Sequence, residues 1–209
     1  MLINKQKKKE MITGRIAKHY DMLIDIDNDP ARDPEVLRKY MDKWDGQAFI
    51  DAMELDKNKS VLEIGIGTGR LAQRVSPLCK ELVGIDVSKK TIERAFANLA
   101  QHNNVELICA DFMKYKFGMC LDVIYSTLTF KHIKQKQKAI DKIYGLLHDK
   151  GRFVLSCDKN KNDFIDAGIS RIKIFPDKDT DIKLYINNAG FTLIRHFETE
   201  FANVYVCKK

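Results

Sequence analysis

The sequence predicts a doubly wound α/β domain, in which helices cover both faces of a mostly parallel sheet. The first observation is that short apolar runs alternate with amphipathic helical stretches from residue 60 onward. The second is that these runs are apolar almost throughout, which is typical of strands buried on both faces. A chain of 209 residues is long enough for one sizeable core, and an α/β domain of this length usually stays undivided.

Five strands are expected in the alternating part of the chain. Each is rich in β-branched and other apolar residues, and the helices between them imply right-handed crossovers between parallel neighbours. The expected ranges are 60–65, 81–86, 105–110, 121–126 and 151–158.

Helices are expected between these strands. The first follows residue 70, the second covers 88–101 with Ser88 as its N-cap, and a third covers 137–147 despite the glycine inside it. The side chains expected to face the core are Leu71, Val75 and Leu78, then Ile92, Ala95, Phe96 and Leu99, then Ile140, Ile143, Leu146 and Leu147.

Both ends of the chain depart from the alternating pattern. Residues 7–24 and 34–54 predict two helices before the first strand. After the last parallel strand, a helix over 179–190 precedes two strands with almost no connection, so an antiparallel hairpin is expected to end the sheet. We therefore divide the chain into a helical extension, 1–58, and the α/β part, 59–209, within one structural domain.

Composition and charge exclude several classes of protein. No apolar run approaches the length of a membrane span, and the N-terminus lacks the apolar stretch of a signal peptide, so we expect a cytoplasmic protein. The net charge is +7, but four lysines lie in the first nine residues, and a solvated tail explains most of the excess. The five cysteines form no C-x-x-C pair, which argues against a disulfide framework and against a metal site.

Three glycines occupy alternate positions in VLEIGIGTGR, residues 61–70. The turn that contains them follows the first strand, and in an open parallel sheet ligands bind at the carboxyl ends of the strands. Glycine permits positive φ and a close approach of ligand to backbone, and the helix that follows points its N–H groups at what is bound. A tight strand-to-helix connection alone would also explain the turn.

Acidic residues end the neighbouring strands. Asp86 ends the second strand, where it can accept hydrogen bonds from both hydroxyls of a ribose, and Asp111 closes the third, where it can accept from an adenine amino group. Glu63 precedes the first glycine and can receive a cationic amine. Each acid alone is more often a turn or cap residue. Together they fit an adenosine that carries a positively charged amino-acid tail.

Two other nucleotide-binding motifs are excluded. A nicotinamide site of the G-x-G-x-x-G type would need its third glycine at position 70, which is Arg70. A P-loop would need Gly-Lys-Ser or Gly-Lys-Thr after the turn, and neither follows.

The stretches VLEIGIGTGR, LVGIDVS, ADF and LDVIYSTLTFKHI, in this order and spacing, resemble the motifs of class I S-adenosylmethionine-dependent methyltransferases. The resemblance covers about residues 60–158 and implies a Rossmann-like sheet of seven strands. It implies S-adenosylmethionine as cofactor and S-adenosylhomocysteine as product. The N-terminal extension would then fold over the cofactor as a lid.

The same resemblance implies roles for individual residues. Glu63 would lie near the methionine amine, and Gly65 and Gly67 would line the cofactor. Asp86 would hold the ribose, and Val87, Asp111 and Phe112 would meet the adenine. Thr127 and Leu128 would flank the sulfonium. An aromatic residue of the N-terminal helix, Tyr20, would cover the cofactor, although a core-packing tyrosine fits the sequence nearly as well.

Catalytic residues are harder to identify, because methyl transfer from a sulfonium needs mainly positioning. Where the acceptor has a proton to lose, a general base helps. His132 and Tyr20 are the candidates, but a local structural role for His132 is favoured. The resemblance puts Lys131, rather than His132, at the position that most often faces the cofactor, and Trp44 is interpreted first as packing and second as a pocket wall.

Three functions remain open. We favour a methyltransferase that acts on a small molecule, because the sequence has neither an Asn-Pro-Pro-Tyr type motif nor a Pro-Cys nucleophile. An RNA or protein methyltransferase and a non-catalytic S-adenosylmethionine-binding module are the alternatives. Basic residues near the expected mouth would suit an anionic acceptor, although a solvated basic surface is the favoured explanation, because long charged side chains usually cover loops. We expect a monomer or a homodimer.

Overall fold

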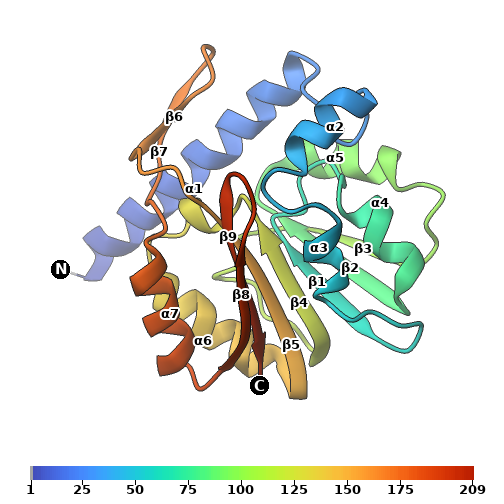
Figure 1. The fold of residues 1–209 in the computed structure, drawn as a ribbon. Helices are drawn as coiled ribbons and strands as arrows, with labels where there is room; N and C mark the ends of the chain where they lie inside the picture. The colour runs from blue at the N-terminus through green and yellow to red at the C-terminus, as the bar shows by residue number, and fades with distance from the viewer. Residues whose placement is uncertain (1) are drawn as a thin grey trace.

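The computed structural model describes residues 2–209, with side chains from residue 13 onward, and places seven strands in one sheet. The strand order is β3-β2-β1-β4-β5-β9-β8, and β9 runs antiparallel to both of its neighbours (Figure 1). The strands are β1 Ser60–Ile64, β2 Glu81–Asp86, β3 Val105–Cys109, β4 Leu121–Thr127, β5 Leu147–Asp158, β8 Thr192–Glu198 and β9 Ala202–Lys208. The predicted doubly wound, mostly parallel sheet with a C-terminal antiparallel hairpin is confirmed.

Helices cover both faces of this sheet. They are α1 Leu2–Asp25, α2 Glu35–Met41, α3 Gly46–Asp51, α4 Ala72–Val75, α5 Lys89–Asn98, α6 Lys136–Leu146 and α7 Asp179–Asn188, with two 3-10 turns, η1 Ser76–Leu78 and η2 Phe130–His132. Leu62 and Ile64 of β1 pack in the cluster with α6 and α7, whereas Val61 packs with α3, α4 and α5. Because successive strand residues point to opposite faces, a strand that is buried along its whole length serves both layers.

The predicted helix over 34–54 is wrong, because the chain forms two short helices there instead. Gly46 has φ of +69°, a conformation that ends a regular helix. The carboxylate of Asp45 accepts a hydrogen bond from the Gly46 N–H at 2.7 Å and caps α3. Helix α2 buries none of its residues. Trp44, just after it, packs on Phe201 with ring centroids 4.7 Å apart.

Two side chains assigned to the core are exposed. Phe96 is 72% exposed and Leu78 is 43% exposed. The buried residues of α5 are Thr91 and Ala95, four positions apart. Phe96 is rotated by about 100° from Ala95, since a helix has about 3.6 residues per turn. Helix α4 ends at Val75, so Leu78 lies in η1 rather than on the apolar stripe.

Two further differences concern strands. The sequence analysis assigned no strand between 159 and 178, but β6 Phe164–Asp166 and β7 Arg171–Lys173 form an antiparallel hairpin there. Strand β5 also begins at Leu147, earlier than the predicted 151, so the third predicted helix ends one residue sooner.

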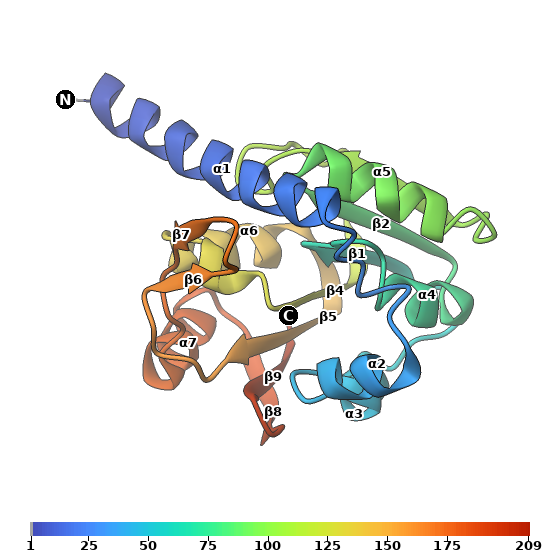
Figure 2. The ribbon, with the colours of Figure 1, turned by 90° about the horizontal axis from the view of Figure 1, so that it is seen from above.

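Helix α1 lies across the carboxyl edge of the parallel strands. Figure 2 looks down on it, where it runs beside α5 and projects past the sheet at its N-terminal end. The carboxylate of Asp21 accepts from the Ser88 hydroxyl at 2.7 Å and from the Lys90 N–H at 3.0 Å. On the other side, His19 is hydrogen-bonded to Ser170, which precedes β7. The N-terminal helix is therefore fixed over this edge from both sides.

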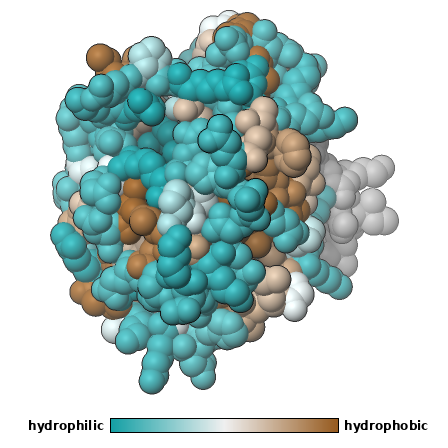
Figure 3. Space-filling view, turned by 90° about the vertical axis from the view of Figure 1, so that its right-hand side faces the viewer, coloured by the Kyte–Doolittle hydropathy of each residue, from teal (hydrophilic) through white to brown (hydrophobic). Residues whose placement is uncertain are grey.

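The surface is mainly polar. The face shown in Figure 3 is largely hydrophilic, with separate apolar patches, as is usual for a folded chain. Within the described part of the chain, no helix has both the length and the apolar character that crossing a membrane requires.

Candidate active site

A cavity of about 580 Å³ lies at the carboxyl edge of the sheet, beneath α1. All eleven residues singled out from the sequence as cofactor contacts or catalytic candidates line it. They are Tyr20, Glu63, Gly65, Gly67, Asp86, Val87, Asp111, Phe112, Thr127, Leu128 and His132. Lys131 and Trp44 do not line it: the Lys131 ammonium pairs with Asp158 at 3.0 Å. The structure thus brings the predicted residues together, and the volume of the cavity is that of a small-molecule site.

The glycine turn has the backbone that the sequence predicts. Gly65, Gly67 and Gly69 have φ of +78°, +57° and +92°, values that side-chain-bearing residues rarely adopt. A Cβ on Gly65 would lie 2.0 Å from the Thr129 hydroxyl, and one on Gly69 would lie 2.9 Å from a Leu99 methyl. A Cβ on Gly67 would meet no atom within 4 Å. Internal packing therefore explains two of these glycines, and only Gly67 leaves backbone open to a ligand.

Glu63 is a buried carboxyl at the base of the cavity. It is 2% exposed, and one of its oxygens accepts a hydrogen bond from the Tyr125 hydroxyl at 2.7 Å. Burial raises the pKa of Glu63 to about 8, although Tyr125 and the nearby Arg70 oppose the shift. A carboxyl in this state ionises readily when a cation comes to lie beside it.

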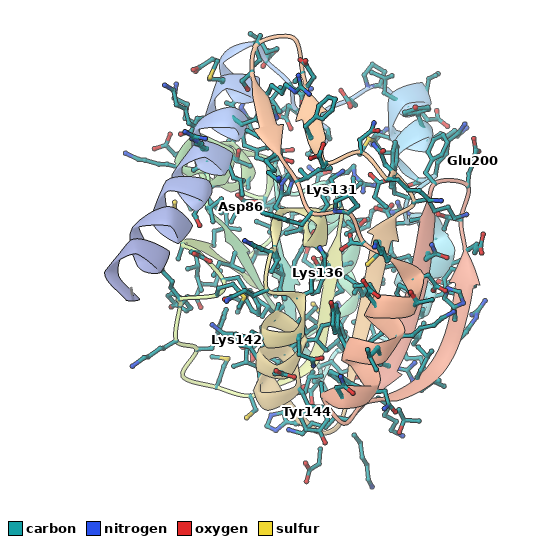
Figure 4. The ribbon with its side chains drawn as sticks, turned by 90° about the vertical axis from the view of Figure 1, so that its left-hand side faces the viewer. Asp86, Lys131, Lys136, Lys142, Tyr144 and Glu200 are labelled. Carbon is teal, nitrogen blue, oxygen red and sulfur yellow. The ribbon has the colours of Figure 1, made fainter. Side chains whose placement is uncertain are left out.

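Asp86 joins the second strand to the glycine turn. Its two oxygens accept from the Gly67 N–H at 3.1 Å and from the Ser88 N–H at 3.0 Å. A carboxylate has about four lone-pair positions, so acceptor capacity remains for a ligand. Burial raises the pKa of Asp86, against the effect of these N–H donors. In Figure 4 its side chain lies beside α1.

The end of β3 supplies the next wall of the cavity. Asp111 accepts from the Met113 N–H at 2.9 Å and from the Thr13 hydroxyl of α1 at 3.4 Å. Phe112 is buried beside it, with the Lys142 ammonium 4.8 Å from its ring centroid. An aromatic side chain next to a carboxylate offers a flat apolar surface and a hydrogen-bond acceptor to a heterocycle.

The end of β4 is held in an uncommon conformation. Leu128 has φ of +56°, which costs a residue with a side chain about 1–2 kcal/mol. The Thr127 hydroxyl before it donates to Asp45 at 3.1 Å, and the Thr129 hydroxyl after it donates to the Thr127 carbonyl at 3.0 Å. These bonds fix the Leu128 backbone against the cavity.

Tyr20 and His132 form a contact between α1 and η2. The Tyr20 hydroxyl lies 2.8 Å from His132 Nε2. Burial lowers the pKa of His132 to about 3, and burial also raises the pKa of Tyr20. The pair is therefore a neutral phenol and a neutral imidazole at physiological pH. Among the described residues, the buried Nδ1 of His132 has no hydrogen-bond partner.

Three residues of the site were missed by sequence reasoning. Asp45, whose side chain is fully buried, accepts from both terminal nitrogens of Arg70 as well as from Thr127. Tyr125 was missed because a tyrosine inside an apolar strand indicates only core packing. The position of Arg70 directly after the glycine turn was the one indication of its role in the sequence. The sequence holds no such indication for Asp45, because its partners lie far along the chain.

The fold and the site agree with the resemblance seen in the sequence motifs. A sheet with this strand order, a glycine turn after β1 and carboxylates at the ends of β1 and β2 is the arrangement of class I S-adenosylmethionine-dependent methyltransferases. Residues 62–155 match the family model described as "Methyltransferase domain". This match bears out the resemblance of the sequence motifs to class I S-adenosylmethionine-dependent methyltransferases.

Two curated relatives match this chain over part of their own length. Malonyl-[acyl-carrier protein] O-methyltransferase 1 of Ilyobacter polytropus is 28% identical over 78% of this chain and 57% of its own length. Ribosomal RNA small subunit methyltransferase A of Trichormus variabilis is 30% identical over 46% of this chain and 33% of its own length. The chain thus spans a third to just over half of these curated relatives.

A solved structure agrees with the fold. The N-methyltransferase NodS of Bradyrhizobium japonicum, in complex with S-adenosyl-L-homocysteine, superposes with a TM-score of 0.64 at 16% identity. The match covers 85% of this chain and 89% of that one.

Proposed function

We propose that this chain is an enzyme that transfers a methyl group from S-adenosylmethionine to a small-molecule acceptor by direct displacement. The observation that carries the proposal is the meeting of Glu63, Asp86 and Asp111 with the open backbone of Gly67 in one cavity. The family match and the S-adenosyl-L-homocysteine in the NodS complex support the choice of cofactor.

The residues present fit this cofactor. Glu63, with its raised pKa of about 8, is suited to receive an ammonium group. Asp86 has spare acceptor capacity for ribose hydroxyls, and Asp111 with Phe112 suits an adenine. When bound, S-adenosylmethionine supplies a methyl group on an already activated sulfonium. The cavity thus offers separate side chains for the ammonium group, the ribose and the adenine of the cofactor.

The chain's own contribution would be positioning and exclusion of water. Helix α1 covers the cavity with Ile16 and Tyr20, and the fixed backbone at Leu128 shapes its floor. Holding two reactants in line is worth up to about 7–11 kcal/mol in favourable cases. The neutral Tyr20–His132 pair would hold the wall opposite the cofactor in place rather than take up a proton.

A small acceptor is favoured over RNA, because several of the basic side chains that suggested an anionic partner form ion pairs within the chain. Several of them are neutralised within the chain: Lys131 by Asp158 at 3.0 Å, Lys136 by Asp177 at 2.5 Å and Lys159 by Glu198 at 2.8 Å. Of the relatives, the one that acts on a carrier-bound malonyl group matches 78% of this chain, and the ribosomal RNA enzyme matches 46%.

The cofactor assignment is tested by calorimetry with S-adenosylhomocysteine. Asp86→Ala removes a charged acceptor and two internal hydrogen bonds. We expect the dissociation constant of S-adenosylhomocysteine to rise about 10- to 100-fold in this variant. Asp149→Ala, at an exposed aspartate that does not line the cavity, is the matched control. Equal affinity of all three proteins would contradict the assigned site.

A further inference from the structure

The acidic side chains that line the cavity lie together at one end of it, and Arg70, the cation beside them, is paired with the buried Asp45 at 2.5 Å. The carboxyl groups, those of Glu63, Asp86 and Asp111, lie at the ends of β1, β2 and β3. The opposite wall runs from the end of β4 through η2 to the start of α6. Among the described residues, that wall contributes Lys134 and Gln135 but no carboxylate.

Acidic groups close to the second wall are already neutralised. Asp158 at the end of β5 pairs with Lys131 at 3.0 Å, and the buried Asp177 pairs with Lys136 at 2.5 Å. Figure 4 shows both lysines on the side of the molecule that carries the β6–β7 hairpin. Neither aspartate lines the cavity, so neither is placed to take a proton from an acceptor there.

The remaining candidates for a general base are weak. His132 is bonded to Tyr20 at 2.8 Å and has a pKa of about 3, which is too low for efficient proton transfer near neutral pH. Tyr20 stays protonated because its pKa is raised. An ammonium, a thiol or a hydroxyl would therefore meet no base at this end. A carboxylate has an ordinary pKa of about 4 and is already deprotonated at neutral pH.

The wall does offer attraction for an anion. Lys134 lines the cavity, is exposed, and forms no ion pair with any described residue. The neighbouring Gln135 adds an amide donor, and Ile133 and Met41 add apolar surface. A cation at the mouth, apolar walls and no base suit an organic acid.

We propose, building on the proposed methyltransferase function, that the methyl acceptor is the carboxylate of a small organic acid and that the product is its methyl ester. A carboxylate oxygen provides the electron pair of the new O–CH3 bond, and the pair of the broken C–S bond stays on sulfur. One negative and one positive charge disappear together, so no proton is released. Amine, thiol or hydroxyl acceptors would release one proton per methyl group.

The chemical test uses methyl-labelled S-adenosylmethionine with straight-chain carboxylic acids, with alkylamines and thiols of matched length, and with the small-molecule fraction of a cell extract. Labelled product that releases volatile methanol in alkali, without acidification of a weakly buffered solution, is the expected result. Base-stable label would overturn the carboxylate acceptor and leave methyl transfer standing. No transfer, although S-adenosylhomocysteine binds, would also overturn it. Failure to bind S-adenosylhomocysteine would overturn the proposed function itself.

A binding measurement tests the wall without turnover. Octanoate is titrated calorimetrically into the protein saturated with S-adenosylhomocysteine. Lys134→Gln should raise the octanoate dissociation constant about fivefold, the upper range for a pair at an exposed lysine. Lys138→Gln, at an exposed lysine of α6 outside the cavity, should leave it unchanged. Equal affinity of both variants for octanoate would remove Lys134 from the acceptor site.

Discussion

Replacing Glu63 with Gln should stabilise the empty protein and weaken its cofactor site at once. The carboxyl is buried and its pKa is raised to about 8 from an ordinary 4.5, chiefly by desolvation. A carboxyl with a raised pKa in the folded state stabilises the fold fully only below its unfolded value. That contribution is lost as the pH rises towards the folded value. The amide side chain of the Glu63→Gln variant is neutral at every pH and avoids this loss.

The size of the effect follows from the shift. One pKa unit corresponds to about 1.36 kcal/mol, so between about pH 5.5 and about pH 8 the wild-type protein should lose about 3 kcal/mol relative to Glu63→Gln. The amide retains the bond from the Tyr125 hydroxyl but adds a buried donor. The absolute stabilities are therefore less informative than the change of their difference with pH.

Urea unfolding of both proteins across this pH range measures that difference directly. In parallel, calorimetry should show weaker binding of S-adenosylhomocysteine to Glu63→Gln, because the anion that would face the ammonium group is gone. A stability difference that stays constant with pH would mean that Glu63 is ionised throughout, and the argument from burial would be refuted.

Four further substitutions separate packing from ligand binding. Gly67→Ala should cost about 1 kcal/mol of stability through its positive φ, yet abolish most cofactor binding, because its methyl group enters the cavity. Gly69→Ala should destabilise the fold more strongly in thermal melts while leaving the cavity open. Asp45→Asn removes the charge that Arg70 faces and, since that arginine is 11% exposed, should cost about 3 kcal/mol by urea unfolding. Tyr20→Phe should lower turnover while leaving S-adenosylhomocysteine affinity within about twofold, since the ring remains and only one hydrogen bond is lost; a larger loss of affinity would place the hydroxyl on the cofactor.

The cofactor end of the site could be predicted because parallel topology does most of the positioning. Once strands 60–65, 81–86 and 105–110 are recognised as parallel neighbours, their carboxyl ends must share one edge of the sheet. Glu63, Asp86 and Asp111 follow from that alone. The structure changed one detail, since packing accounts for Gly65 and Gly69 and leaves Gly67 as the open position.

The rest depends on contacts that local pattern does not encode. Asp45 lies 25 residues from Arg70 and 82 from Thr127 along the chain, and a lone aspartate carries no sign of either partner. The split between α2 and α3 depends on the positive φ of Gly46, which the helical sequence pattern around this residue does not reveal. Strands β6 and β7 have three residues each, too short for an alternation of polar and apolar residues to be visible.

The two ends of the cavity therefore differ in how freely they can change. The cofactor end is built from strand termini that also carry the core, so most substitutions there disturb the fold. The opposite wall joins Tyr20 to His132 across 112 residues. The anchors of α1 lie outside the cavity, where Asp21 meets Ser88 and Lys90. The exposed side chains of Lys134 and Gln135, by contrast, can vary without loosening either the sheet or the helix, and we expect the acceptor to be selected at this part of the wall.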